Sequence, residues 1–170
     1  MNDQAFPNPF KTELPTDAPL IIMSRTFAAP LALVWKVWTE KEHVAHWWGF
    51  GNNEVVEYDV RTGGKWRIVG LSPDGTRWVM FGTYLAVEPK HLIRNTFVVE
   101  GAFEEDERYY EEHHFEERDG KTYYRSISNF PDFEMRDATV DTGMEWGANV
   151  SMVQFDAILD RLMGKDGGAA

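Results

Sequence analysis

Glu111 and His113 are the pair of residues in this sequence best suited to proton transfer. They lie two positions apart, so on a β-strand both would project from one face, with about 7 Å between their Cα atoms. A carboxylate at that spacing could orient the imidazole, which could then act as a general base. His114 would point to the opposite face of the strand, so the two histidines cannot share a metal ion.

The turn signal Asp119-Gly120 places the strand of His113 in a hairpin with the strand that follows it. The resulting register pairs three residues of each strand on one face: Phe115 with Tyr124, His113 with Ser126, and Glu111 with Ser128. Buried polar groups usually serve hydrogen bonding, so a polar recognition cluster is favoured over a catalytic dyad. A one-residue bulge would instead turn the same residues to solvent. Both orientations stay open at this point.

Aromatic residues form the second chemical feature. Five of the seven tryptophans fall between residues 35 and 66. Such clustering indicates either a heavily aromatic core or the wall of a ligand cavity. The candidate wall residues are Trp35, Trp47, Trp48, Trp66, Trp78 and Tyr84, with Met144 from the last helix. Methionine and aromatic residues in such positions belong to a core more often than to a ligand site.

The elements that must position these residues follow from the period of the apolar pattern. A first strand is predicted over residues 20–27, followed by a helix that Pro30 opens and whose apolar face includes Leu31, Val34, Trp35 and Trp38. A second short helix is predicted over residues 40–48. Period-two alternation then predicts strands over residues 55–60, 65–71, 77–87, 92–99, 109–118 and 122–130. Residues 142–163 repeat apolar positions every three or four residues, which predicts a long amphipathic helix with Asp141 as its N-cap. This order indicates an α+β domain in which an antiparallel sheet covers the long helix.

The chain divides into three parts. Residues 1–19 contain four of the eight prolines and are expected to form an extended arm. Phe6, Phe10 and Leu14 could dock this arm on the domain or on a partner, although a poorly ordered terminus is equally consistent. Residues 20–163 form the predicted single domain, and residues 164–170 a flexible glycine-rich tail.

Composition excludes several classes of function. A net charge of −11 disfavours nucleic acid and anionic membranes as partners. The absence of cysteine excludes disulfides and thiolate chemistry. No signal peptide or membrane span is visible, so a cytoplasmic location is predicted. His43-x-x-His46 is too incomplete to predict a metal site, and no cofactor is predicted.

The sequence resembles the activator of heat shock protein 90 ATPase homologue family of the START/Bet v allergen-like (SRPBCC) superfamily. The motifs that carry the resemblance are Arg25-x-Phe27-x-Ala29-Pro30, Val34-Trp35-x-x-Trp38-Thr39, Trp47-Trp48-Gly49, Gly63-Gly64-x-Trp66-Arg67, Gly82-x-Tyr84, Val87-Glu88-Pro89 and Thr142-Gly143-Met144-Glu145-x-Gly147. The resemblance implies a helix-grip fold, with a cavity between the curved sheet and the C-terminal helix. In the family the hairpin face that carries Phe115 tends to be apolar, whereas here the same face is polar.

These observations predict that the cavity binds a small hydrophobic or amphipathic molecule. The predicted ligand-binding residues are Trp35, Trp47, Trp48, Trp66, Trp78, Tyr84, Glu111, His113, Tyr124, Ser126, Ser128 and Met144. One alternative is a co-chaperone-like module, with a role in the stress response, that stimulates a chaperone ATPase. Another is a cyclase- or hydrolase-type enzyme that uses His113 and Glu111 as acid and base without a metal. A homodimer or another protein partner also stays open.

Overall fold

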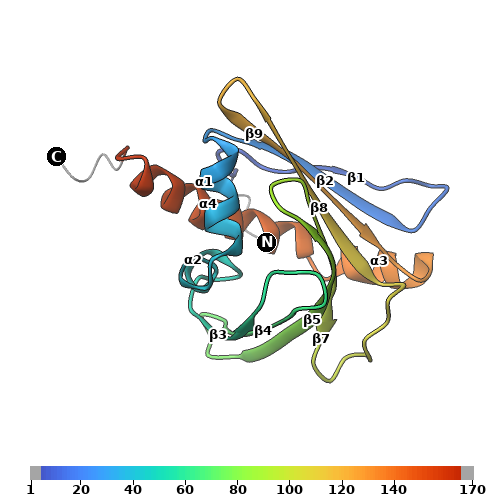
Figure 1. Cartoon of the computed structure of the whole chain (residues 1–170). Helices are drawn as coiled ribbons and strands as arrows, with labels where there is room; N and C mark the ends of the chain where they lie inside the picture. Colours follow the sequence, from blue (N-terminus) through green and yellow to red (C-terminus); the bar gives the residue numbers. More distant parts are fainter. Residues whose placement is uncertain (1–4, 166–170) are drawn as a thin grey trace.

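The structure is a computed structural model that describes residues 5–165 of the chain (Figure 1). The first four residues of the predicted arm, and the part of the predicted tail beyond residue 165, lie outside the described residues. Within the described residues the chain forms nine strands and four helices. The predicted α+β class is confirmed, and the structure adds one strand and one helix to the predicted elements.

All strands belong to one curved, open antiparallel sheet. The strands are β1 (Lys11–Glu13), β2 (Leu20–Phe27), β3 (Asn53–Tyr58), β4 (Lys65–Leu71), β5 (Arg77–Glu88), β6 (Leu92–Thr96), β7 (Val98–Val99), β8 (Tyr110–Arg118) and β9 (Lys121–Asn129). Their order across the sheet is β1-β2-β9-β8-β6-β5-β4-β3, and β7 pairs with β5. The predicted strand over residues 92–99 is therefore divided into β6 and β7, which pair with separate stretches of β5.

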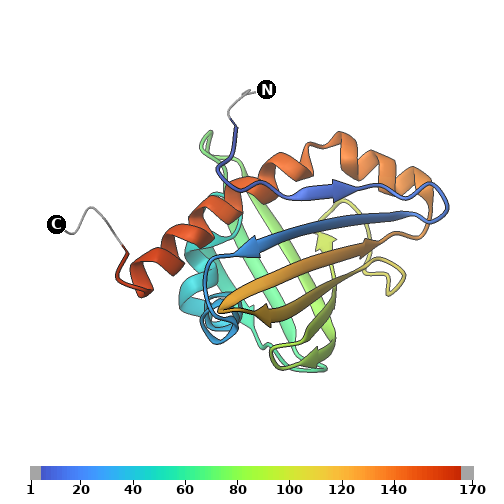
Figure 2. The same ribbon diagram turned by 90° about the horizontal axis from the view of Figure 1, so that it is seen from above.

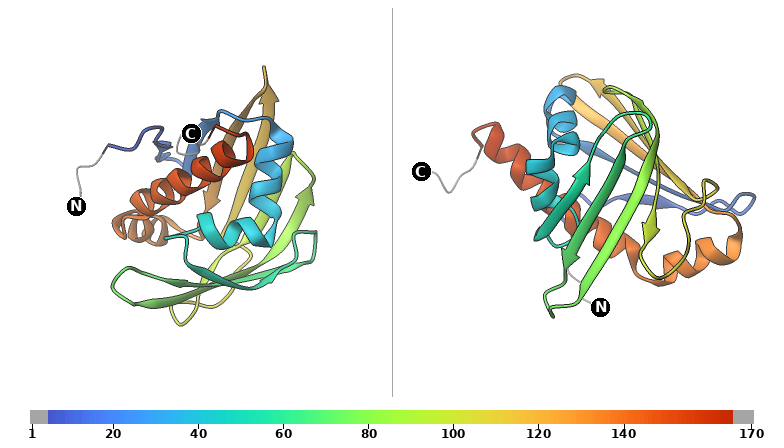
Figure 3. Two further views of the ribbon diagram at one scale, coloured as in Figure 1. Left: turned by 90° about the vertical axis from the view of Figure 1, so that its left-hand side faces the viewer. Right: turned by 60° about the horizontal axis from the view of Figure 1, so that its bottom comes forward.

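The helices lie on the concave side of the sheet and at one end of it (Figure 3). They are α1 (Leu31–Thr39), α2 (Lys41–Trp47), α3 (Phe133–Asp141) and α4 (Met144–Leu162). The long helix α4 runs through the curve of the sheet because its buried residues recur at spacings of three and four, among them Met152, Phe155 and Leu159. One face of α4 therefore belongs to the core.

The start of α4 differs from the prediction. Asp141 is the last residue of α3, and the N-cap of α4 is Gly143, which makes no side-chain capping bond. Gly143 has a φ of 80°, in the left-handed region that glycine adopts without strain. The chain thus turns sharply between two helices where the sequence predicted the start of one.

The segment before β2 packs along the domain. β1 pairs with the edge of β2, and in the view from above it runs beside α4 (Figure 2). Phe10 is buried, and its backbone N–H donates to the Asn149 Oδ1 of α4 at 2.9 Å. Phe10 also lies 6.0 Å from the ring of Tyr124, so this aromatic side chain closes one edge of the core. Leu14 in contrast stays exposed.

The hairpin of β8 and β9 has the predicted register. Phe115 pairs with Tyr124, His113 with Ser126, and Glu111 with Ser128. The face that carries these pairs is the inner one, because Phe115 and Tyr124 are buried against Trp38 of α1 at ring distances of 5.3 and 5.0 Å.

None of the helices in residues 5–165 is both long enough and apolar enough to cross a membrane.

Candidate functional site on the inner face of the sheet

A row of polar side chains crosses the inner face of three neighbouring strands. We call it the inner polar row, and it comprises Asn95, Glu111, His113, Tyr124, Ser126 and Ser128. Asn95 of β6 pairs with Glu111 of β8, which in turn pairs with Ser128 of β9. Side chains of paired residues lie on the same face of a sheet. Polar groups from three strands are thereby brought together on the inner face of the sheet.

His113 lies at the centre of this row and contacts polar groups through both ring nitrogens. Its Nδ1 is 2.7 Å from the Tyr124 hydroxyl, and its Nε2 is 3.5 Å from a carboxylate oxygen of Glu111. A separation of 3.5 Å makes the contact of His113 with Glu111 a loose one. The imidazole thus connects the phenol to the carboxylate.

The hydroxyl of Tyr124 is a donor in this arrangement. Burial raises the pKa of Tyr124 well above its usual value, and the negative charge of Glu111 raises it further. A phenol that keeps its proton donates to Nδ1 of a neutral imidazole, which leaves the imidazole proton on Nε2. That proton then points toward the carboxylate of Glu111, which can only accept. We assign this tautomer from the contacts of the two ring nitrogens.

Solvent reaches part of the inner polar row. The side chain of Glu111 is 23% exposed and that of His113 is 13% exposed, although both project from the inner face. Tyr124, Ser126 and Ser128 are buried beside them. A hydrophobic core excludes water from its polar groups, so Glu111 and His113 lie at the border of the core and not within it.

Two aromatic clusters flank the inner polar row. The closed cluster surrounds Trp38, whose ring lies within 6 Å of five other rings, those of Trp47, His113, Phe115, Tyr124 and Phe155. The open cluster surrounds Phe97, which lies 6.3, 5.6 and 6.1 Å from Trp48, Trp66 and Tyr109. Trp48 and Phe97 are only partly buried, whereas Trp38 and Phe155 are fully packed.

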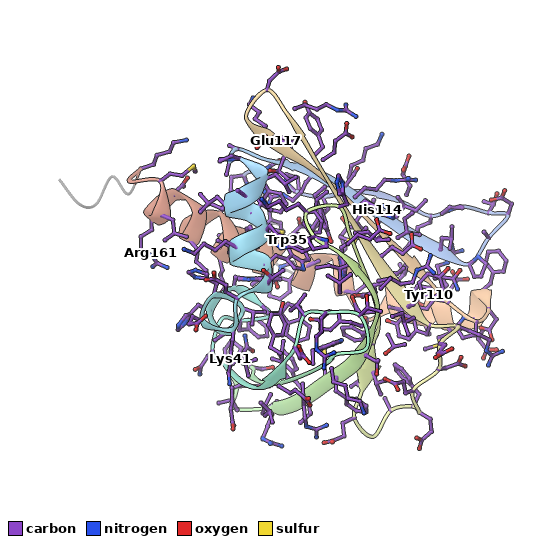
Figure 4. All side chains as sticks on the ribbon, in the orientation of Figure 1. Trp35, Lys41, Tyr110, His114, Glu117 and Arg161 are labelled. Carbon is purple, nitrogen blue, oxygen red and sulfur yellow. The ribbon has the colours of Figure 1, made fainter. Side chains whose placement is uncertain are left out.

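The predicted wall residues fall into these two groups. Trp47 belongs to the closed cluster, where its indole N–H donates to the Val37 carbonyl at 2.9 Å. Trp35 packs edge-on against Phe115 at 5.5 Å, under the hairpin tip where Glu117 accepts the backbone N–H of Leu31 (Figure 4). Trp48 and Trp66 belong to the open cluster.

The remaining predicted wall residues lie on β5 and α4. The ring of Trp78 lies 5.4 Å from that of Trp48, and it covers Gly70, where an added Cβ would stand 2.2 Å from the ring. Tyr84 is buried against Tyr58. Met144 packs on the core from the first turn of α4 and keeps partial exposure. Of these three residues, Trp78 extends the open cluster through its contact with Trp48.

Asn95, Phe97 and Tyr109 are further residues of this region that the sequence did not predict. Asn95 belongs to β6 and alternates with the buried Ile93, whereas Phe97 lies just after β6 and Tyr109 just before β8. An asparagine within an apolar alternation was the available signal for Asn95. Phe97 lies in the break between β6 and β7, where the sequence predicted one continuous strand over residues 92–99.

The outer face of the same hairpin is differently built. Glu112 receives hydrogen bonds from Arg94 Nε at 2.9 Å and from the His114 ring at 2.8 Å. A hollow of about 1060 Å³ lies beside this face, between the hairpin and the turn that joins β5 to β6. Its outward-facing lining includes His91, His114, Glu116, Arg118, Tyr123 and Arg125. Among residues 5–165 no three His, Asp or Glu side chains are grouped to hold a metal ion.

A curved, open antiparallel sheet that wraps a long C-terminal helix defines the helix-grip fold of the START/Bet v-like (SRPBCC) superfamily. Within it, residues 28–160 match the family described as Activator of Hsp90 ATPase homolog 1-like protein, and the chain belongs to this family. The resemblance found in the sequence motifs is therefore confirmed.

Solved structures show the same fold. The crystal structure of protein Ms6760 from Mycobacterium smegmatis is similar with a TM-score of 0.80 and 24% identity, over 91% of this chain and 99% of that one. A solution structure from Arthrobacter aurescens has a TM-score of 0.77 and 22% identity, over 89% and 91% of the two chains. CalU16 from Micromonospora echinospora has a TM-score of 0.57 and 19% identity, over 93% and 76%. No curated protein matches the sequence.

Proposed function

We propose that the protein binds a small amphipathic molecule on the inner face of its sheet. The polar end of the molecule would contact the inner polar row, and its apolar part would lie against the open aromatic cluster. The observation that carries this proposal is the partial exposure of Glu111 and His113, together with that of Phe97 and Trp48 in the open cluster, which includes Tyr109 two residues before Glu111. Small-molecule sites typically combine an aromatic or apolar lining with a few polar groups, and the inner face offers both.

The open cluster supports this location better than the closed cluster does. Trp38, Trp47 and Phe155 fill the space under α1 with ring-to-ring contacts of 5.0 to 5.6 Å. A ligand there would have to displace the core. Phe97 and its neighbour Trp48, in contrast, are only partly buried, so a ligand there would contact aromatic side chains without displacing the packed core. Ligand contacts by Trp48, Trp66, Trp78 and Met144 are part of this proposal.

Native mass spectrometry of the freshly purified chain, followed by organic extraction, tests this function directly. We expect an added mass that disappears on denaturation and is recovered in the extract. His113→Ala should lower retention of this molecule, whereas His114→Ala, one position along on the outer face, should not. Equal retention by both variants would place binding elsewhere and contradict the proposal.

Acid–base catalysis is the second candidate function, because Tyr124, His113 and Glu111 form a connected chain of contacts. In an enzyme the Nε2 side of His113 would exchange a proton with the substrate, with Glu111 beside it. Turnover of a molecule recovered from the extract, lost in His113→Ala with binding retained, would favour catalysis. A co-chaperone role, a homodimer and a cytoplasmic location stay predictions.

A further inference from the structure

We propose that the polar end of the ligand is a positively charged amine, which Glu111 binds as counter-ion. This inference rests on the proposed function and specifies the chemical class that the inner face accepts. It follows from three features of the inner face: its charge, its aromatic composition and the position of the chain's cations.

Among the described residues the carboxylate of Glu111 lacks a permanently charged partner. No Lys or Arg nitrogen of residues 5–165 lies within 4.0 Å of it, and its one ionic contact is the loose one to His113. The inner face has one nearby arginine, Arg25 of β2, and both of its terminal nitrogens bind Asp156 at 3.0 and 2.7 Å. Arg25 is thus already neutralised. A carboxylate held near an apolar interior is stabilised by a cation, which the protein itself does not supply.

The surroundings of Glu111 suit an organic cation. Tyr109 lies two residues before Glu111, and its phenol is buried. Burial raises the pKa of this phenol, and the nearby charge of Glu111 raises it further. Tyr109 joins the open cluster through Phe97, 6.1 Å away, and Phe97 leads to Trp66 and Trp48. Aromatic faces attract ammonium groups through their quadrupoles, most strongly those of tryptophan. A carboxylate at the end of an aromatic wall therefore recognises an amine attached to an apolar body.

The same arrangement rejects acids. A carboxylate or phosphate ligand would meet Glu111 where water is limited and repulsion is weakly screened. The hairpin cations that could attract an anion, Arg94, Arg118 and Arg125, lie on its outer face or at its tip. The net charge of −11 also favours the approach of cations over anions.

Three probes with one apolar body separate this inference from the proposed function. These are 1-naphthylmethylamine, 1-naphthalenemethanol and 1-naphthoic acid, each titrated calorimetrically into the full chain at neutral pH. We expect the amine to bind with a stoichiometry of one and about tenfold more tightly than the alcohol, and the acid to bind most weakly. An alcohol or acid that binds as tightly as the amine would overturn the amine inference and leave the proposed function standing.

Matched variants locate the effect. Glu111→Gln should remove the preference for the amine and leave the affinity for the alcohol nearly unchanged. Glu112→Gln removes the same charge from the outer face and should preserve the ranking of the wild-type chain. If Glu112→Gln abolished the preference as well, the amine would be responding to overall charge, and the assignment to Glu111 would be wrong. If none of the three probes bound, the proposed function and the amine inference would fail together. The wild-type ranking decides the inference even if Glu111→Gln does not fold.

Discussion

The β8–β9 hairpin carries the same short motif on its two faces, with opposite outcomes. Glu111 and His113 lie inside, and Glu112 and His114 lie outside, one residue further along. The outer pair is close, at 2.8 Å, and Arg94 supplies Glu112 with a permanent cation. The inner pair is 3.5 Å apart, and among residues 5–165 no arginine or lysine joins it. Identical residue types are thus neutralised on one face and left unbalanced on the other.

The residue paired with each glutamate on the neighbouring strand decides whether the charge of that glutamate is compensated. On the outer face Arg94 of β6 pairs with Glu112, whereas on the inner face Asn95 pairs with Glu111. An asparagine leaves the negative charge uncompensated, and an arginine cancels it. The outer pair is exposed mainly at its histidine, because the side chain of His114 is 44% exposed and that of Glu112 is 13% exposed. The inner pair is exposed mainly at its carboxylate, which is 23% exposed against 13% for His113.

Truncation of the aromatic residue on each face gives the largest expected contrast. Phe115→Ala should lower the free energy of unfolding by about 3–5 kcal/mol, because the ring is buried against Trp35, Trp38 and Tyr124. Tyr123→Ala, on the outer face, should cost less than about 1 kcal/mol, since its exposed ring contacts chiefly Arg118. Urea denaturation followed by tryptophan fluorescence measures both. Equal losses would mean that the two faces are not distinguished by packing.

Removal of the partner of Arg25 tests how strongly the inner face penalises an unpaired charge. Asp156→Ala should lower the free energy of unfolding by about 3 kcal/mol, because the Arg25 side chain is 1% exposed and would lose both hydrogen bonds. Glu116→Ala is the outer control, as its partner Arg118 is mostly exposed, and it should lower the free energy of unfolding far less than Asp156→Ala does. Thermal unfolding of both variants in the same buffer would show the contrast. A small effect of Asp156→Ala would imply that water reaches Arg25.

Loss of one hydroxyl group examines the contact of His113 itself. Tyr124→Phe should lower the free energy of unfolding by about 1 kcal/mol, because Nδ1 of His113 loses its 2.7 Å donor while the ring stays in place. Tyr123→Phe should change stability by less than about 0.3 kcal/mol, since the Tyr123 side chain is exposed to water. Nitrogen NMR of the imidazole would in addition report a changed tautomer in Tyr124→Phe alone. An unchanged spectrum would contradict the proposed direction of the hydrogen bond.

The sequence was sufficient to predict most elements and the hairpin register. Period-two and period-3.6 patterns are local properties, and Asp119-Gly120 is a strong turn signal. α3 was missed because it buries Arg136 in place of an apolar stripe, so its pattern carries no helical period. β1 was missed because three residues at a sheet edge are held by pairing with β2 and not by a pattern of their own.

The orientation of the hairpin could not be predicted from the hairpin alone. Both faces alternate polar and aromatic residues, so the choice depends on packing against α1, where Trp38 contacts Phe115 and Tyr124. The balance of charge also depends on β6, about twenty residues earlier in the chain, which supplies Arg94 to one face and Asn95 to the other. Such pairings join distant segments, and the period of a single strand does not encode them.

The smallest expected effect is the pH dependence of the outer pair. Burial alone would raise the pKa of Glu112, but the hydrogen bonds from His114 and Arg94 outweigh it and lower the pKa overall. A carboxyl whose pKa is lower in the folded state stabilises the fold above its unfolded pKa, and that contribution disappears as pH falls through the folded pKa. Wild type should therefore exceed Glu112→Gln in stability at neutral pH, and the difference should shrink below about pH 4. Urea denaturation at both pH values measures the difference, and a constant gap would show that charge is not its source.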